Sequence, residues 1–325
     1  MPTRVVFFLL PKLHLLDLAG PAQVFSTAND LGYGYDLTYL AEAPEIITAQ
    51  GVPIRARLDW PELRPADLIV VPGWRSPRFT PTPHISALAK QRLRAHHAAG
   101  GSVASVCSGA DALGAAGLLD GRRYTTHHDL TDELAARYPK ANIVRDVLYV
   151  VDDRVITSAG IASGIDLALH LVAAARGADV AARIAREMVV YARRNGDEPQ
   201  DSAMLRHRGH LSDLAHRVQD IIDSRYADQL RLSDLAAGVG VSERTLTRIF
   251  TQATGLTPLR YQQLLRLERA EHLIGHGSTV EAAARAVGFE DARMLRRLRA
   301  RPVAEPLTGP QPVAGVDVTP LSHGV

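Results

Sequence analysis

Residues 232–255 read LSDLAAGVGVSERTLTRIFTQATG, a pair of short helical patterns separated by a glycine-containing turn. Ser233 and Ser242 each stand where they would cap the start of a helix. Gly238 and Gly240 supply the turn, since glycine adopts backbone angles that other residues avoid. The inward faces of the two helices carry the apolar residues Leu235, Ala236, Leu246, Ile249 and Phe250. The stretch therefore predicts a helix-turn-helix unit.

The outward face of the second of these helices suits contact with DNA. Arginine and small polar side chains on a recognition helix reach base edges and phosphates in the major groove. We therefore expect double-stranded DNA as a partner. The predicted contacts are Ser242, Glu243, Arg244, Thr245, Thr247 and Arg248.

A long helix and a second, similar unit follow. Residues 258–275 have apolar residues at helical spacing and a proline in the first turn. Residues 278–301 read STVEAAARAVGFEDARMLRRLRAR, with Ser278 and Asp291 placed as caps and Gly288 as the turn. The DNA contacts predicted for the last helix are Arg293, Arg296 and Arg297.

Residues 212–300 resemble an AraC/XylS-family DNA-binding domain, in which one linker helix joins two helix-turn-helix units. The resemblance rests on three elements in the right order, LAAGVGVSERTLTRIFTQATGLTP, LRLERAEHLI and AAARAVGFED. The second unit departs from the family, because no aromatic residue follows Phe289 and Pro302 ends the last helix. We therefore expect the first unit to supply most of the base-specific readout and the second mainly phosphate contacts.

Charge is divided unevenly along the chain. Residues 1–201 contain 21 lysines and arginines and 22 aspartates and glutamates. Residues 202–301 contain 16 basic residues, all of them arginine, and 11 acidic residues. An arginine-rich domain suits phosphate contacts and guanine recognition. Together with the polar run RRNGDEPQDS, residues 193–202, this shift divides the chain. The predicted parts are an α/β domain at 1–195, a linker at 196–210, a DNA-binding domain at 211–301 and a Pro/Gly-rich disordered tail at 302–325.

The first part alternates short apolar runs with helical patterns, which indicates a mostly parallel sheet sandwiched by helices, a flavodoxin-like α/β fold. The predicted strands are Val5–Leu10, Tyr35–Leu40, Leu68–Val71, Ser102–Val106, Val147–Val150 and Val155–Ser158. The predicted helices are Gly20–Asn29, Ile85–Ala99, Ala110–Ala116, Leu130–Tyr138, Gly164–Ala175 and Val180–Arg194.

The only cysteine of the chain falls in SVASVCSGADALGAAGLLDG, residues 102–121, which reads as strand, sharp turn and helix. Cys107 would sit at the turn, as at a nucleophile elbow, at the N-terminus of the following helix. Helix N-termini carry partial positive charge, so we expect a lowered pKa for the Cys107 thiol. A single cysteine also excludes an intramolecular disulfide.

Two other segments complete a predicted ligand pocket. LLDLAGP, residues 15–21, places Asp17 in a turn after the first strand, where its alternative role is to cap the turn or helix. VVPGW, residues 70–74, ends a buried strand with Gly73 and Trp74, the latter either lining the pocket or contacting the ligand. The predicted ligand-binding residues are Asp17, Gly73, Trp74, Cys107 and Ser108.

With TTHH and DRVITSAGIASGIDLALHLV, these segments resemble the ThiJ/PfpI domain of the class I glutamine amidotransferase-like superfamily, over residues 4–195. Its fusion to an AraC-type domain resembles GlxA-like regulators. The likeness to isonitrile hydratases implies catalysis by Cys107 and Asp17. Superfamily proteases have histidine directly after the cysteine, where this chain has Ser108, so a Cys–His dyad is unsupported. For His127 and His128 we expect polar packing rather than metal binding.

Three functions follow from this pattern. The first is a cytoplasmic, homodimeric transcription regulator that binds a small effector near Cys107. The second is a Cys107-dependent hydratase or amidase-like enzyme with a DNA-binding appendage. The third is an interaction protein whose α/β domain only dimerises. We favour the first, with no cofactor, no metal and no membrane span, since the longest N-terminal apolar run is only Val5–Leu10.

Overall fold

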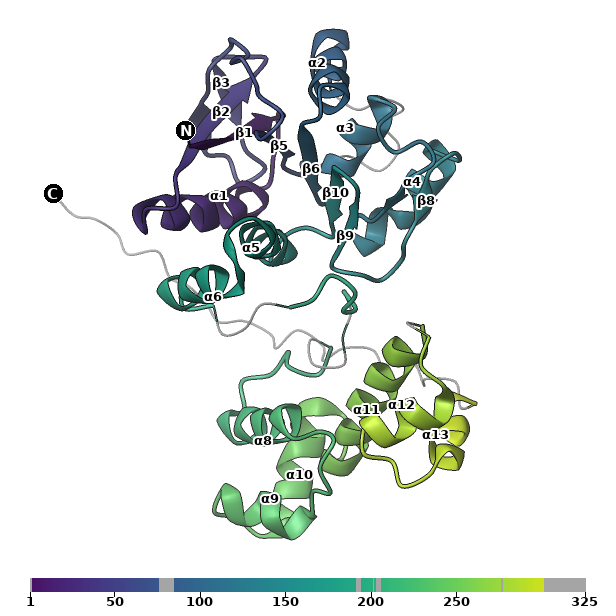
Figure 1. The fold of residues 1–325 in the computed structure, drawn as a ribbon. Coiled ribbons are helices and arrows are strands. Elements are labelled where there is room, and N and C mark those ends of the chain that lie inside the picture. The colour runs from purple at the N-terminus through teal and green to yellow at the C-terminus, as the bar shows by residue number, and fades with distance from the viewer. Residues whose placement is uncertain are drawn as a thin grey trace, which may run out of the picture. The chain divides into compact units, whose positions relative to one another are not determined.

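The computed structural model describes residues 2–75, 85–190, 194–200, 202, 206–275 and 277–300. The chain forms two compact units, Met1–Asp201 and Ser202–Val325. In Figure 1 the strands belong to the first unit, and the described part of the second is helical. The expected tail at 302–325 lies outside the described residues, as do residues 191–193 of the helix expected to reach Arg194.

A six-stranded sheet in the order β2-β1-β5-β6-β10-β9 forms the centre of the first unit. Its neighbouring strands are parallel except β10 and β9. The strands are β1 (Thr3–Leu9), β2 (Tyr35–Ala41), β5 (Leu68–Val71), β6 (Ser102–Val106), β9 (Tyr149–Asp152) and β10 (Val155–Ser158). Two small pairs lie outside it, β3 (Glu45–Ile47) with β4 (Pro53–Arg55), and β7 (Arg123–Tyr124) with β8 (Asn142–Ile143).

Helices cover both faces of this sheet, which confirms the predicted fold class. Strands buried on both faces are apolar throughout rather than alternating; in β1, Phe7 enters one core and Phe8 the other. The core of Phe7 is closed by α1 (Leu15–Asp30), α5 (Ser163–Arg176) and α6 (Ala178–Glu187). The core of Phe8 is closed by α2 (Ala87–Ala98), α3 (Gly109–Ala115), η1 (His128–Leu130) and α4 (Thr131–Arg137).

Helix α1 begins earlier than its sequence predicts. It starts at Leu15 rather than Gly20, so Asp17 lies in the first turn of the helix and not in a turn after β1. A Cβ atom on Gly20 would lie 2.9 Å from the side chain of Ile165 in α5. Gly20 therefore permits close packing of α1 on α5, and this tertiary contact outweighs the helix-breaking tendency of Gly20-Pro21.

The second unit contains both predicted helix-turn-helix units around one long helix. The helices are α8 (Asp213–Ser224), α9 (Leu232–Gly238), α10 (Glu243–Thr254), α11 (Pro258–Gly275), α12 (Val280–Ala286) and α13 (Ala292–Arg299). Leu265 of α11 belongs to the core of the first helix-turn-helix unit and Leu267 to the core of the second helix-turn-helix unit. In the second core, Leu295 and Leu298 of α13 are buried with Phe289.

Capping matches the sequence at the two helices with exposed cationic faces. Ser242 accepts a hydrogen bond from the Thr245 N–H at 3.2 Å. Asp291 accepts from the Arg293 and Met294 N–H groups at 2.6 and 3.2 Å. Each cap satisfies N–H groups that have no partner within the helix, which fixes where α10 and α13 begin.

Capping differs from the sequence prediction at the other two short helices. Arg231, not Ser233, occupies the position before α9, and its main-chain oxygen starts the helical hydrogen bonds. Thr279, not Ser278, caps α12. The two hydroxyls are adjacent, so packing of the α12 alanines into the core decides between them. Gly238 ends α9, and the turn is made by Gly240 at a φ of +72°.

The predicted linker at 196–210 is held at both of its ends. The segment 194–200, called the strap below, packs on the first unit, where Arg194 pairs with an aspartate of α5 at 2.7 Å. Arg208 pairs with two aspartates of α8 in the second unit. Described residues on both sides of 201–205 are therefore anchored, each to a helix of its own unit.

Candidate functional site

Three adjacent strands bring the predicted pocket residues together. In parallel sheets, the loops after the carboxyl ends of neighbouring strands converge and commonly form binding sites. Here Asp17 follows β1, Gly73 follows β5 and Cys107 follows β6. A Cβ atom on Gly73 would lie 2.5 Å from Asp17 Oδ2 and 2.7 Å from Cys107 Cβ. Only glycine leaves room for the two side chains to meet.

Cys107 occupies the sharp turn that the sequence predicted. Its φ is +55°, an uncommon conformation for a residue with a side chain, and it lies between β6 and α3. The turn is held by the Cys107 N–H, which donates to the Ser158 oxygen at 2.9 Å. Gly160 packs directly against it, since a Cβ there would lie 2.2 Å from Cys107 Cβ. Strain of this kind clusters at functional sites.

Asp17 is a fully buried carboxyl group that faces the thiol. Its Oδ1 accepts a hydrogen bond from the Ile161 N–H at 2.6 Å, and the Gly73 N–H and Cys107 side chain lie on its other side. Burial raises the pKa of Asp17, and the Ile161 N–H and the nearby His14 oppose that shift. The group is therefore more easily protonated than an ordinary aspartate.

The thiol of Cys107 has a raised pKa, contrary to the sequence expectation. Burial is the largest cause, and the charge of Asp17 adds to it, while the Ser108 N–H opposes the shift. The residue is 7% exposed. The partial charge of a short helix does not offset the loss of hydration and the neighbouring carboxylate, so the thiol form dominates at neutral pH.

Ser108 and Trp74 form a buried pair of hydrogen bonds beside Cys107. The Ser108 hydroxyl donates to the Trp74 oxygen at 2.8 Å and accepts from the Trp74 N–H at 2.7 Å. Trp74 is 3% exposed and its ring packs in the core beneath α2 and α3. These bonds tie the loop after β5 to the start of α3 and so fix the wall beside Cys107.

Thr126, which the sequence did not single out, connects the Cys107 turn to the strap. Its hydroxyl donates to the Cys107 oxygen at 2.9 Å. Its own oxygen accepts from Gln200 Nε2 at 2.9 Å, and Gln200 is bonded in turn to Asp146 and to the oxygen of Val147. A buried threonine after a two-residue strand gives no periodic signal, so only the fold reveals the connection.

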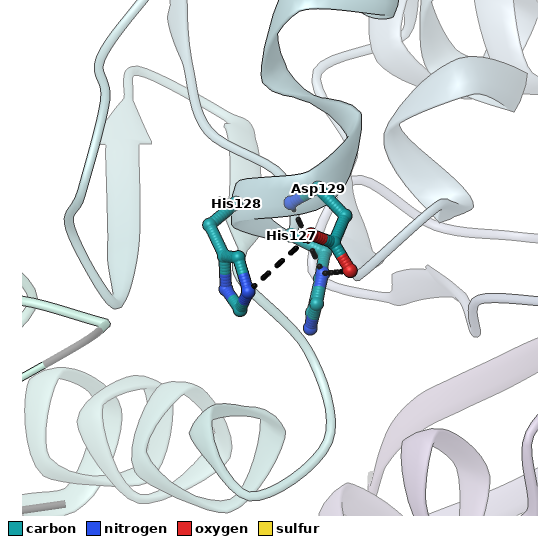
Figure 2. A group of neighbouring side chains, drawn as sticks. All are labelled: His127, His128 and Asp129. Atoms are coloured by element: carbon teal, nitrogen blue, oxygen red, sulfur yellow. Dashed lines mark hydrogen bonds and ion pairs between the residues drawn. The ribbon is translucent and has the colours of Figure 1, made fainter. Parts of the chain in front are cut away.

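His127, His128 and Asp129 gather on one short turn next to Thr126. Figure 2 shows both rings beside the Asp129 carboxylate, with the two ion-pair distances 3.8 Å from His127 Nδ1 and 3.6 Å from His128 Nε2. Potential ligand atoms of all three lie within 4.8 Å of one another, whereas the sequence showed no metal-ligand spacing. The turn lies close to the elbow, because Thr126, directly before His127, donates its hydroxyl to the Cys107 oxygen.

The predicted DNA contacts lie on α10 and α13. On α10, Ser242, Glu243, Arg244 and Arg248 are exposed, and Thr245 and Thr247 are half-buried. On α13, Arg293, Arg296 and Arg297 are exposed. Arg296 is ion-paired with Glu281 of α12.

Comparison with known proteins identifies both parts. Residues 3–174 match the DJ-1/PfpI family, and residues 235–306 match a helix-turn-helix domain. The chain belongs to the DJ-1/PfpI family. This DJ-1/PfpI protein is 28% identical over 306 residues to the HTH-type transcriptional regulator CdhR of Pseudomonas aeruginosa, covering 92% of this chain and 89% of CdhR.

Two further relatives each match a little over half of this DJ-1/PfpI protein. An isonitrile hydratase of Pseudomonas putida is 32% identical over 186 residues, which are 56% of this chain and 75% of the hydratase. The crystal structure of an AraC family transcriptional regulator from Pseudomonas putida matches with a TM-score of 0.50 and 25% identity, over 57% of this chain and all of that chain.

A DJ-1/PfpI domain followed by an AraC-type helix-turn-helix domain is the organisation of a DNA-binding transcription regulator, and this confirms the expectation from the sequence that the chain is such a regulator. Within the described parts of this DJ-1/PfpI protein, none of the helices combines the length and apolar character required to span a bilayer.

Proposed function

We propose that the DJ-1/PfpI domain is the sensing part of this regulator and binds a small molecule beside Cys107. The observation that carries the proposal is the hydrogen-bonded path from the Cys107 oxygen through Thr126 to Gln200. Gln200 is the last described residue of the first unit, directly before the connection to the DNA-binding domain. A ligand that moves the Cys107 turn would therefore disturb the end of the strap.

The ligand-binding residues we propose lie on the loops that meet beside the thiol: Asp17, Gly73, Trp74, Cys107 and Ser108. Asp17 offers a carboxyl group to an amine or amide, and main-chain N–H groups of the turn offer donors to a carboxylate. The ligand class is thus a small nitrogenous or amino-acid-like metabolite. Because Cys107 is almost closed off, the occupant is small.

We propose that the regulator acts as a homodimer in the cytoplasm. Effector binding would shift the dimer between arrangements that present the DNA-binding domains differently. Support comes from a hollow of about 390 Å³ over α1, whose apolar lining is Leu15, Leu18, Ala19 and Ala22 of that helix with Tyr39 and Ile54. Burying such a surface against a second copy would stabilise a dimer.

For DNA we propose that α10 supplies most base contacts and α13 mainly phosphate contacts. Arg244 projects from the capped start of α10, the end of a recognition helix that approaches bases, and Arg248 is exposed one turn further along the helix. The proposed contacts are Ser242, Glu243, Arg244, Thr245, Thr247, Arg248, Arg293, Arg296 and Arg297.

The test begins with an operator selected in vitro by the full chain. A panel of amino acids and small amines is then screened for a shift in melting temperature and for a change in operator affinity. Cys107→Ser should lose both responses while basal DNA binding stays. Gln200→Ala should still bind the compound but lose the change in DNA affinity, whereas Glu198→Gln in the same strap should respond normally.

Three outcomes would contradict the proposal. One is a Gln200→Ala variant whose DNA response equals that of the natural chain. Another is a compound that still acts on Cys107→Ser. The third is measurable hydration of an isonitrile that is lost in both Cys107→Ser and Asp17→Asn, which would favour the enzyme alternative suggested by the hydratase relative.

A further inference from the structure

The turn after β7 places three metal-binding side chains on one side of the chain. His127 precedes η1 with extended backbone angles, φ −56° and ψ 140°, while His128 and Asp129 are already within the turn. This change of direction brings consecutive side chains together, as Figure 2 shows. The two rings lie 4.2 Å apart between centroids, at an angle of 31°.

The spacing of the donor atoms is close to what a small dication requires. Ligands about 2.1 Å from a tetrahedral ion lie about 3.4 Å from one another. Asp129 Oδ2 is 3.8 Å from His127 Nδ1 and Asp129 Oδ1 is 3.6 Å from His128 Nε2, and one ligand atom from each of the three residues lies within 4.8 Å of the others. Small side-chain rotations would bring the three atoms to binding distance.

The backbone of the turn is fixed without using most of these donor atoms. The Leu130 N–H donates to the His127 oxygen at 2.9 Å, and the Thr131 hydroxyl donates to the His128 oxygen at 2.8 Å. The ring nitrogen His127 Nδ1 accepts only a long bond, 3.3 Å, from the Asp129 N–H. Because the turn is already ordered, metal binding costs little further conformational entropy.

We propose that His127, His128 and Asp129 bind a divalent transition-metal ion, with Zn²⁺ as the reference ion. Two imidazoles and one carboxylate suit Zn²⁺, Co²⁺, Ni²⁺ or Fe²⁺, whereas Ca²⁺ and Mg²⁺ take oxygen ligands. Three protein ligands leave at least one position open to water or an exogenous ligand. The site stands on its own donors and does not depend on the sensing role proposed for Cys107.

The experiment uses the untagged full chain, stripped with a chelator and titrated with Zn²⁺ in a non-chelating buffer. We expect one ion per chain at this site, and Co²⁺ should give a visible absorption band of the same stoichiometry. His128→Gln and Asp129→Asn should each weaken Zn²⁺ binding by at least about tenfold. Both residues are largely exposed, so the metal-free variants should keep the melting temperature of the natural chain.

Matched controls remove charge or imidazole nearby but outside the turn. Asp132→Asn, three residues on and 89% exposed at its side chain, should bind Zn²⁺ normally. His216→Gln tests the stacked His210–His216 pair of the second unit. The proposal is overturned if His128→Gln and Asp129→Asn bind like the natural chain. It is equally overturned if the measured site is lost in His216→Gln instead.

Discussion

A Cβ atom on Gly288 would lie 1.9 Å from the main-chain oxygen of Ala227. The turn of the second helix-turn-helix unit thus packs, main chain against main chain, on the loop that follows α8. Arg266 of α11 stabilises the same contact. Its guanidinium donates hydrogen bonds to the main-chain oxygens of Gly288, Tyr226, Ala227 and Asp228. The two helix-turn-helix units are therefore joined by this contact as well as by α11, the helix they share.

Gly288→Ala should destabilise the second unit of the chain more than Gly240→Ala. Both glycines have positive φ, +83° and +72°, so both substitutions add backbone strain of about 1 to 3 kcal/mol. Only Gly288 also faces a main-chain oxygen that has no room to move, whereas nothing lies within 4 Å of a Cβ on Gly240. Denaturant unfolding followed by far-UV circular dichroism measures the loss of helical structure in each variant.

The tryptophans provide the internal control for that measurement. Both of them, Trp60 and Trp74, belong to the first unit, so their fluorescence follows that unit alone. We expect Gly288→Ala to leave the fluorescence transition in place. Equal losses of stability in the two glycine variants would show that the contact with Ala227 is unimportant.

Asp17→Asn should gain stability relative to the natural chain as the pH rises from 4 to 7. Because folding raises the pKa of Asp17, the stabilisation it gives is present below its unfolded pKa, near 4, and is lost as the pH rises through the folded value. The free energy of unfolding falls by about 1.4 kcal/mol for each pH unit that separates the unfolded and folded pKa values of Asp17. Asparagine has no such ionisation.

Urea unfolding at a series of pH values measures this difference. Asp30→Asn, at the exposed end of the same helix, controls for the removal of a carboxylate from α1. A stability difference between Asp17→Asn and the natural chain that stays constant from pH 4 to 7 would mean that folding leaves the ionisation of Asp17 unchanged.

Cys107 should react with iodoacetamide at pH 7 more slowly than a free thiol, since burial and the charge of Asp17 both disfavour the thiolate. Asp17→Asn removes one of these causes, so the midpoint of the pH–rate profile should fall. Asp129→Asn should lower it less, because Asp129 is the weakest contributor to the raised pKa. The chain has no other cysteine to confuse the labelling. A midpoint that rises in Asp17→Asn would contradict the assignment.

Arg244→Ala should change the preferred operator sequence, whereas Arg293→Ala should weaken binding to all sequences about equally. Loss of one phosphate contact should reduce the slope of the logarithm of the binding constant against the logarithm of the salt concentration by about one. Glu281→Gln should strengthen non-specific binding, because it releases Arg296 from its ion pair. Selection of binding sites by each variant, at two salt concentrations, checks all three. Equal base discrimination by α10 and α13 would refute the proposed division of roles.

Local sequence patterns predicted the fold more completely than the chemistry of the candidate site. The apolar run that becomes β1 and the elbow at Cys107 are encoded within a few residues, so the sequence predicts them correctly. The start of α1 depends on Gly20 meeting Ile165, a contact between residues far apart in the chain. The direction of the Cys107 pKa shift likewise depends on burial and on Asp17, which only the folded chain brings near.

The four carbonyl contacts of Arg266 have a mechanical consequence for the operator. These bonds tie the loop after α8 to the turn before α13. We therefore expect α10 and α13 to keep a nearly fixed separation. Any mismatch between their separation and the pitch of the double helix must then be taken up by bending of the DNA. Flexible pyrimidine–purine steps midway between the two contacted grooves should tighten binding, although no side chain touches them.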